Sequence, residues 1–341
     1  MTVTRVAACH AAPVFLSARQ TTEKAIQLIH EAAQNNAHLV VFPETYISAF
    51  PVWSALRPPT ENHSLFERMV AESIYADGEE IAAIRSAARA TNAIVGIGLS
   101  EKSRFSTATL YNSNILIDRD GSVLTAHGNI GNLICGENTN PLARYMLMAQ
   151  AEQIHISAWP AIWPTRIPSE SSSAEAGADA GGNYDNVAAN RTRAAAHCFE
   201  AKCFGILCAG FLDENAIETV TAGSSTPDIV RGALQRSPRG ASMFLNPTGA
   251  AHPALIFSAT GEREEREFLQ GEGILYADFD LDRCVEGKQY RDVVGGYQRF
   301  DVFKLQVKRE RVDPVVFRDA VASKQEEGKE EGKEKEGVSE V

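Results

Sequence analysis

The stretch Ile130-Gly-Asn-Leu-Ile-Cys135-Gly-Glu137-Asn138 joins an apolar run directly to a cysteine. Asn129 to Ile134 predicts a buried strand, and Asn140-Pro141 before an apolar run predicts the start of a helix. Cys135 therefore lies at a turn from strand to helix, where backbone N–H groups and the helix dipole can lower a thiol pKa and bind an oxyanion. Cys135 is thus a candidate nucleophile, although an inert buried cysteine fits the same surroundings.

A second apolar strand, His38 to Phe42, ends at Pro43-Glu44. Ligands of open α/β sheets bind at the carboxyl ends of the strands. Glu44 is therefore placed to act as a base toward a thiol from another strand of the same sheet, so we expect Glu44 and Cys135 to face one cavity. The alternative is a glutamate that simply begins a solvated loop.

Helix and strand patterns alternate along the chain, which predicts an α/β architecture with helices covering the sheet faces. Apolar periodicity predicts amphipathic helices over Thr21 to Asn36, Gly78 to Asn92 and Asn183 to Lys202. Strands are predicted over Val3 to Cys9, Ala93 to Leu99, Gln153 to Ala158 and Phe204 to Ala209, and later hairpins at Ala241 to Asn246 and Ile274 to Phe279 extend the sheet. A hairpin is predicted over Tyr111 to Asp118 and Gly121 to Ala126.

Composition excludes several classes of protein. The 341 residues exceed the usual size of one domain, but α/β sandwiches and barrels of this length form one domain. The net charge of -11 argues against a nucleic-acid partner, which needs clustered Lys and Arg. We expect no membrane segment, because no apolar run reaches about 18 residues. The N-terminus begins a strand rather than a secretory signal.

The 6 cysteines do not form a disulfide or metal framework. None belongs to a Cys-x-x-Cys pair, and no histidine cluster has zinc spacing. We therefore expect free thiols in a reducing, cytoplasmic compartment and no bound metal.

Two segments differ from the rest in composition. Ser169 to Gly182, which is rich in Ser, Ala and Gly, predicts a flexible loop, and the charged tail from Ser323 to Val341 predicts disorder within an extension over 311–341.

Several separated motifs recur in one order from about Thr4 to Val307. They are Phe42-Pro43-Glu44-Thr45, Ala49-Phe50-Pro51, Leu110-Tyr111-Asn112, Leu133 to Asn138, Pro141 to Tyr145, Gln153-Ile154-His155 with Ala158-Trp159-Pro160, Glu200 to Phe204, and Glu272 to Asp280 with Asp292, Gly295, Tyr297 and Asp301 to Phe303. Together they resemble the nitrilase branch of the carbon–nitrogen hydrolases. The resemblance implies a four-layer αββα sandwich over residues 1–310.

The resemblance also implies a chemistry. Cys135 matches the family's nucleophile and Glu44 its general base, and Tyr46, Glu137 and Trp159 are expected near the substrate, although Trp159 fits ordinary packing equally well. The family needs no cofactor. Its members act on small nitriles or amides and assemble as dimers or spirals, so a homo-oligomer is expected. Arg191 and Arg193 are candidates for a carboxylate contact at a subunit interface, and Glu137 is expected to pair with Arg144.

The lysine of the family's catalytic set has no counterpart. In the family a His-Arg-Lys stretch, a further glutamate, a glycine-rich loop and a strand follow the hairpin. Here the hairpin reaches His127, and the next residues already precede the cysteine strand, so the domain is shortened near 127–129. No lysine occurs between Lys102 and Lys202. Gly136 is a second departure, because nitrilases usually carry tryptophan there.

Three functions follow. The first is hydrolysis of a nitrile to a carboxylic acid and ammonia through a cysteine thioimidate and thioester, weakened because loss of one charge-stabilising donor costs about 2.7–4 kcal/mol. The second is a catalytically dead nitrilase-fold protein, or the product of a shortened reading frame, that acts by co-assembly. The third is an activity like that of cyanide hydratase or an amidase.

Overall fold

The computed structural model describes residues 3–124, 129–163, 185–258 and 260–308. The chain divides into a compact unit, Met1–Leu305, and a second unit, Gln306–Val341. The first unit contains every helix and strand given below. The predicted loop over 169–182, the junction at His127–Gly128 and the charged tail from Ser323 lie outside the described residues.

The first of two sheets carries the Glu44 strand. Its order in the described chain is β11-β10-β13-β1-β2-β3-β4, with β1, β2 and β3 parallel to one another and the other pairs antiparallel. The strands are β1 (Val3–His10), β2 (Leu39–Val41), β3 (Ile94–Lys102), β4 (Leu110–Ile117), β10 (Ala254–Phe257), β11 (Arg263–Arg266) and β13 (Gly273–Asp280). Glu44 follows β2, in the interior of this sheet.

The second sheet carries the cysteine strand at its edge. Its order is β12-β8-β7-β6-β5, and β9 pairs with β8. The strands are β5 (Ile130–Ile134), β6 (Ile154–Trp159), β7 (Phe204–Ala209), β8 (Ser242–Leu245), β9 (Ala251–His252) and β12 (Phe268–Leu269). Because β5, β6 and β7 are parallel, their carboxyl ends meet at one edge of the sheet, next to Cys135.

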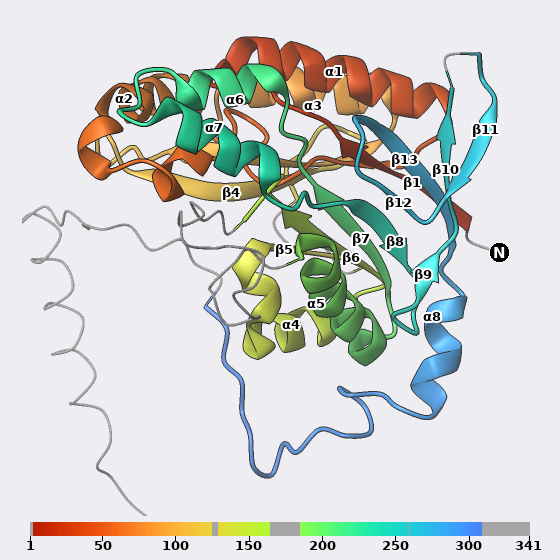
Figure 1. Ribbon diagram of the computed structural model, residues 1–341. Coiled ribbons are helices and arrows are strands. Elements are labelled where there is room, and N and C mark those ends of the chain that lie inside the picture. The colour runs from red at the N-terminus through yellow and green to blue at the C-terminus, as the bar shows by residue number, and fades with distance from the viewer. Residues whose placement is uncertain (1–2, 125–128, 164–184, 259, 309–341) are drawn as a thin grey trace, which may run out of the picture. The chain divides into compact units, whose positions relative to one another are not determined.

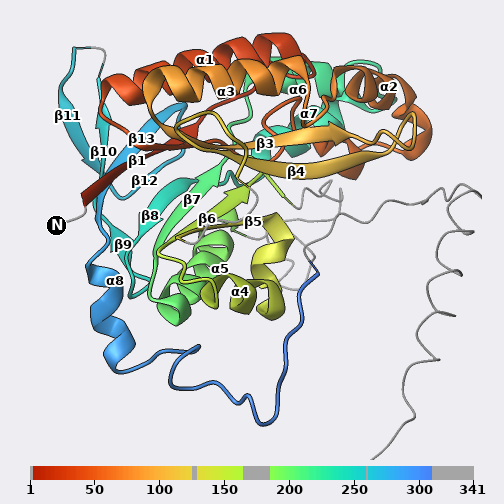
Figure 2. The ribbon, with the colours of Figure 1, turned by 180° about the vertical axis from the view of Figure 1, so that it is seen from behind.

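Helices cover the outer face of each sheet (Figures 1 and 2). Helices α1 (Ala18–Gln34) and α3 (Glu79–Thr91) lie on the first sheet, and α4 (Pro141–Met148) and α5 (Asn186–Ala201) lie on the second. The predicted αββα sandwich is therefore confirmed. The remaining helices are α2 (His63–Glu72), α6 (Glu214–Thr221), α7 (Pro227–Arg236) and α8 (Arg283–Glu286), with short 3₁₀ turns η1 (Val52–Ala55), η2 (Pro59–Glu61), η3 (Cys135–Thr139) and η4 (Gly287–Gln289).

Alternation along β1 shows why the chain forms these layers. Ala7 and Cys9 pack under α1 and α3, whereas Val6 and Ala8 pack between the two sheets. A strand buried on both faces reads as a continuous apolar run, which is the pattern of Val6 to Cys9. Helix α1 meets β1 through Ala25, Ile29 and Ala32, a spacing that keeps one helix face apolar.

The predicted elements agree with the structure apart from two differences. The segments Ala241 to Asn246 and Ile274 to Phe279, expected as hairpins, each form a single strand, β8 and β13, and these strands belong to different sheets. The second arm of the predicted hairpin forms no strand in its described part, which ends at Leu124. A single bridge between Ile117 and Val123 follows the tight turn at Gly121, whose φ is +79°. No helix in the described ranges is long and apolar enough to cross a bilayer.

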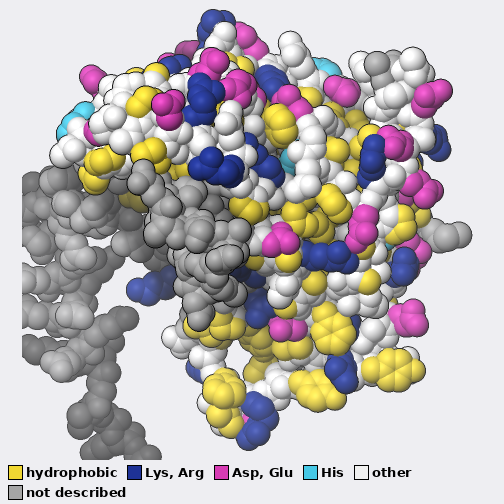
Figure 3. Space-filling view, in the orientation of Figure 1, with side chains coloured by type: hydrophobic (Ala, Val, Ile, Leu, Met, Phe, Trp, Pro, Cys, Tyr) yellow, Lys and Arg dark blue, Asp and Glu magenta, His cyan; other side chains and the backbone are white. Residues whose placement is uncertain are grey.

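An irregular segment after η4 carries exposed aromatic side chains, and hydrophobic atoms gather on that part of the surface in Figure 3. Its exposed members are Tyr290, Tyr297, Phe300 and Phe303. Apolar patches of this kind mark protein–protein contacts. The homo-oligomer expected from the sequence stays a prediction.

Candidate active site

The cysteine turn is sharper than a regular strand-to-helix junction. β5 ends at Ile134, and Cys135 has φ +42°, a left-handed conformation that residues other than glycine rarely adopt. The 3₁₀ turn η3 follows, and α4 begins only at Pro141, where the Asn140 side chain accepts from the N–H groups of two residues in its first turn. The predicted strand and helix are confirmed. The first amide groups of α4, however, lie several residues beyond the thiol.

Glu44 reaches the same place from the first sheet. Its carboxylate is buried, and Oε1 accepts a hydrogen bond of 2.6 Å from Asn112 Nδ2. The hydroxyl of Thr45 donates to the other end of that amide at 2.9 Å. The Cys135 thiol lies near enough to affect the pKa of the Glu44 carboxyl group, whose second oxygen, Oε2, has no hydrogen-bond partner among the described residues. Glu44 and Cys135 are therefore neighbours, but the expectation that both come from one sheet is wrong, because β2 and β5 belong to different sheets of the sandwich. That they face one cavity stays a prediction.

A glycine in β3 fixes the course of the Glu44 loop. A Cβ at Gly98 would lie 2.4 Å from the Pro43 carbonyl oxygen and 2.5 Å from the Thr45 nitrogen. The loop therefore lies directly against β3. The backbone N–H of Ile47 donates to the Gly98 carbonyl at 3.1 Å, which holds the loop there.

Burial dominates the titration of both groups. It raises the pKa of Glu44 to about 7, against the lowering effect of the hydrogen bond from Asn112 and of the nearby Cys135 thiol. It also raises the pKa of Cys135 to about 12, and the charge of Glu44 raises it further, whereas the Gly136 N–H and Arg193 lower it. The expectation of a lowered thiol pKa is therefore wrong in its net direction. The thiol stays protonated beside a carboxylate that gains and loses its proton near neutral pH.

Two hollows adjoin Glu44. A cavity of about 40 Å³ is lined by Glu44 and Tyr46 from the loop after β2 and by residues that follow β6 and β7, including Pro160, Ala161 and Phe211. This is room for one or a few water-sized groups. A wider hollow of about 390 Å³ lies beyond Thr45 and Asn112. Both are lined by Thr45 and Phe50, so the Glu44–Asn112 pair lies between them.

The other predicted site residues have mixed placements. Tyr46 lines the smaller cavity, and its hydroxyl donates to the Ala12 carbonyl. Trp159 is buried in the apolar cluster against which Cys135 packs. Glu137 is exposed at the turn, where its carboxylate accepts from the Ile134 N–H at 2.9 Å. An added Cβ at Gly136 would meet no described atom within 4 Å, so this position faces open space.

The expected ion pair between Glu137 and Arg144 is wrong. Arg144 pairs instead with Glu200 on α5 at 2.9 Å. The carboxylate of Glu137 is held by the backbone of its own turn, which keeps it away from α5.

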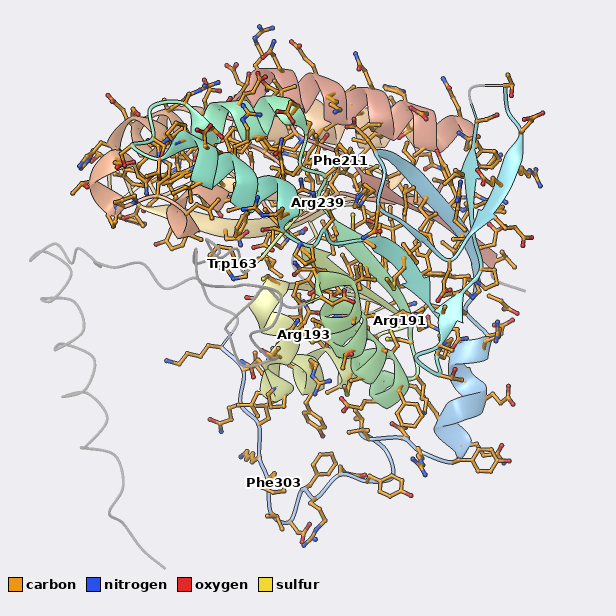
Figure 4. The ribbon with its side chains drawn as sticks, viewed as in Figure 1. Trp163, Arg191, Arg193, Phe211, Arg239 and Phe303 are labelled. Atoms are coloured by element: carbon orange, nitrogen blue, oxygen red, sulfur yellow. The ribbon has the colours of Figure 1, made fainter. Side chains whose placement is uncertain are left out.

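Arg193 is the cation whose charge acts on the thiol in the described chain. It projects from α5 with Arg191 (Figure 4), and its guanidinium lies 5.4 Å from the centre of the Trp159 ring. Lys102 and Lys202 donate to the backbone carbonyls of Ala71 and Phe199 instead. Arg191 pairs at 2.9 Å with Glu267 of its own chain.

Sequence reasoning missed three residues of this site. Leu110-Tyr111-Asn112 signalled the family, but nothing in that stretch shows that its amide binds Glu44. Asn138, which donates to the Cys135 carbonyl, and Arg193 were also missed, because each reaches the site from a distant element or through a turn of unknown shape.

Replacing Glu44 by glutamine is expected to stabilise the protein at pH 8 by up to about 3 kcal/mol. The folded-state pKa of Glu44 is about 7 against an ordinary value of 4.5. As pH rises from 4.5 to 7, the unfolded chain loses this proton while the folded chain keeps it, so wild-type stability falls. Urea unfolding of Glu44→Gln and wild type at pH 5 and pH 8 measures the difference. The gain should be small at pH 5, and Glu79→Gln on the exposed first turn of α3 should show no such change with pH.

The chain is similar in sequence to a known family of proteins. The model of a family described as carbon-nitrogen hydrolase matches residues 5–127 and 122–289. An arylacetonitrilase of Hypocrea virens is 31% identical over 345 positions, which cover 92% of this chain and 94% of that protein. A nitrilase of Paraburkholderia phymatum is 27% identical and covers 92% of this chain and 89% of its own length.

Solved structures agree on the fold. Saccharomyces cerevisiae Nit3, described as a member of branch 10 of the nitrilase superfamily, superposes with a TM-score of 0.57 at 14% identity. The match covers 88% of this chain and 97% of Nit3. The NitFhit protein of C. elegans gives a TM-score of 0.58 at 15% identity and covers 92% of this chain and 69% of its own.

Proposed function

The chain belongs to the carbon–nitrogen hydrolase family, on its nitrilase branch, and on this premise we propose that Cys135 and Glu44 convert a small nitrile into a carboxylic acid and ammonia. The observation that supports the proposal most is that the Cys135 thiol and the buried Glu44 carboxyl group lie near enough to affect each other's pKa, and that the pKa of Glu44 is about 7. A base with a pKa near the working pH suits both the removal and the return of a proton.

The first half of the proposed cycle forms a covalent intermediate. The Glu44 carboxylate takes the thiol proton, and Cys135 Sγ bonds to the nitrile carbon. One π bond of the C≡N group becomes a lone pair on nitrogen, which accepts the proton from Glu44. The product is a thioimidate on Cys135.

The second half returns the enzyme to its starting state. Glu44 takes a proton from a water molecule that adds to the thioimidate carbon, and the nitrogen leaves as ammonia once it is protonated. A thioester remains. A second water molecule adds in the same way and releases the carboxylic acid, while the proton returns to Cys135 Sγ. Two water molecules are consumed for each nitrile.

The lack of a positively charged group beside the reacting carbon, in the described part of the chain, limits the rate of this cycle. Negative charge grows on nitrogen or oxygen in each addition step, and the family's lysine would stabilise it. The loss of one such donor slows turnover on the order of a hundred- to a thousandfold. Among the described residues, the Gly136 N–H and the charge of Arg193 act on the thiol and supply positive potential there. We therefore expect turnover that is slow but measurable.

A break in the family match favours a second candidate, a non-catalytic chain that acts by co-assembly. The family model matches in two pieces that meet at residues 122–127. The alignment to the H. virens protein spans 345 positions yet covers only 92% of the 341 residues, so about 30 of its positions face gaps in this chain. Both observations support a missing internal segment near 127–129, where the lysine belongs.

The experiment that decides among these functions is a product assay on the purified full chain. The substrates are aliphatic, aromatic and arylaceto nitriles, the corresponding amides, and cyanide. The proposal predicts equal amounts of ammonia and carboxylic acid from at least one nitrile. Amide as the sole product would point to a hydratase, ammonia from amides alone would point to an amidase, and no product from any substrate would favour co-assembly.

A further inference from the structure

A chain of buried polar side chains lies behind the Cys135 turn, and the proposed cycle does not use it. It links η3 to β6 and α5 in the second half of the sandwich. All of its members are buried. The chain, called here the Asn138 network, consists of Asn138, Ser157, His155, Glu152 and His197.

Asn138 holds the turn by two carbonyl groups. Its Nδ2 donates to the carbonyl oxygens of Leu133 and Cys135, each at 3.1 Å. Its Oδ1 accepts from the Ser157 hydroxyl at 2.9 Å. Because carbonyl oxygens only accept hydrogen bonds, these contacts fix which end of the amide faces the turn. Asn138 thus ties the end of β5 to the left-handed residue that follows it.

The orientation of Asn138 determines the protonation of the histidines. His155 Nε2 lies 3.0 Å from Asn138 Oδ1, so Nε2 must carry a hydrogen. His155 Nδ1 is 2.7 Å from one oxygen of Glu152, and His197 Nε2 is 2.5 Å from the other. Each contact needs a proton between the two atoms. A carboxylate and two neutral imidazoles supply only two protons for these three positions, so the network carries one more proton and is neutral as a whole.

Electrostatics agree with one shared positive charge. Although burial raises the pKa of Glu152, the two histidines lower it to about 2. Burial lowers the pKa of His197, but Cys203 and Glu152 raise it to about 9. Burial and the charge of His197 lower the pKa of His155. These directions place the single charge on His197, whereas the contacts of both His155 nitrogens with acceptors place it on His155, and the network holds one positive charge in either case.

A metal ion is the competing interpretation of this cluster. Donor atoms of Glu152, His197 and Cys203 lie within 4.8 Å of one another. Two ligand atoms bound to one zinc ion at about 2.1 Å are roughly 3.3 Å or more apart. The 2.5 Å contact between Glu152 and His197 is too short for that arrangement and fits a charge-assisted hydrogen bond.

The backbone of β5 makes room for the network. A Cβ at Gly131 would lie 1.8 Å from Glu152 Oε1. Only glycine at this position lets the carboxylate reach His155, which pairs with Gly131 across the sheet.

We propose that the Asn138 network is a positioning device, in which the paired charges of Glu152 and the histidines hold Asn138, and Asn138 holds Cys135 in the strained conformation that presents its thiol to Glu44. The inference rests on the proposed function of Cys135 and Glu44. A left-handed non-glycine residue persists only where its surroundings enforce it, and the two bonds from Asn138 are such an enforcement.

Iodoacetamide labelling of Cys135 between pH 5.5 and 9, followed by peptide mass spectrometry, tests this without any turnover. In wild type the labelling rate should show an added step as Glu44 loses its proton near pH 7, on top of the steady rise with pH that any protonated thiol shows, and Glu44→Gln should remove that step. Asn138→Leu, which matches the volume but cannot donate, should also remove it and slow labelling at pH 7.5 on the order of ten- to a hundredfold. Asn62→Leu is the matched control, because it removes a buried amide that donates to the Arg57 carbonyl outside the network; it should label within about twofold of wild type.

If Asn138→Leu fails to fold, Glu152→Gln provides the same test, because Glu152 acts on Asn138 through His155. It should weaken the step at pH 7 while circular dichroism and thermal melting show a folded protein. A folded Asn138→Leu or Glu152→Gln that keeps the wild-type profile would overturn the positioning role alone. A wild-type protein without any step near pH 7 would overturn the proposed Cys135–Glu44 pair and the positioning role with it.

Discussion

Cys135→Ala is expected to lower ammonia release from every nitrile that the chain hydrolyses by at least about a thousandfold. Alanine has no nucleophile to form the thioimidate. The other thiols, those of Cys9, Cys198, Cys203, Cys208 and Cys284, are buried and cannot take over. An ammonia assay at saturating nitrile, with protein folding checked by circular dichroism, measures the loss.

Cys284→Ala is the matched control for this prediction. Cys284 lies on α8, where its thiol donates to the Gln153 carbonyl, and its loss should leave ammonia release within about twofold of wild type. Equal activity of Cys135→Ala and wild type would show that the hydrolysis does not pass through this thiol.

Restoring the lysine segment is expected to raise turnover by roughly a hundred- to a thousandfold. The variant carries a family-type segment, from His-Arg-Lys through the following strand, inserted between His127 and Gly128. The physical reason is that an ammonium group beside the reacting carbon stabilises the negative charge of each tetrahedral species, which no described lysine of this chain does. The ratio of kcat for the insertion variant to kcat for wild type, on one nitrile, is the quantity to measure.

A second insertion variant separates charge from fold. It carries the same segment with methionine in place of the inserted lysine. If the lysine acts as proposed, this variant should fold equally well and turn over no faster than wild type. Equal rates for the lysine and methionine insertions would show that the segment acts through the fold, and wild-type turnover equal to the lysine variant would show that Arg193 already supplies the missing charge.

Local sequence patterns predict the parts of the site that local interactions build. The apolar run before Cys135 and the Asn140-Pro141 cap are sufficient to place a strand, a turn and a helix, because each depends on neighbouring residues. Glu44 at the end of β2 was predictable for the same reason. The nitrilase-branch motifs supplied the sandwich, which periodicity alone leaves as a general α/β architecture.

Contacts between distant elements explain what the sequence did not predict. Cys135 and Glu44 meet because two sheets stack, and a strand pattern does not say which sheet a strand joins. The sign of the thiol pKa shift depends on burial beside Glu44, which outweighs the Gly136 N–H. Arg144 pairs with Glu200 on α5 because the Glu137 carboxylate is bound to the backbone of its own turn.

The most direct test of the Cys135–Glu44 site is the covalent intermediate itself. The full chain is mixed with a nitrile that it turns over, and the reaction is quenched in acid within the first turnovers. The protein is then digested, and the masses of its peptides are measured by mass spectrometry. The account predicts that the peptide containing Cys135 gains the mass of the thioimidate or the acyl thioester, and that Cys135→Ala shows no adduct on any peptide. Ammonia release with an adduct on another residue, or without any adduct under conditions that trap thioesters, would contradict it.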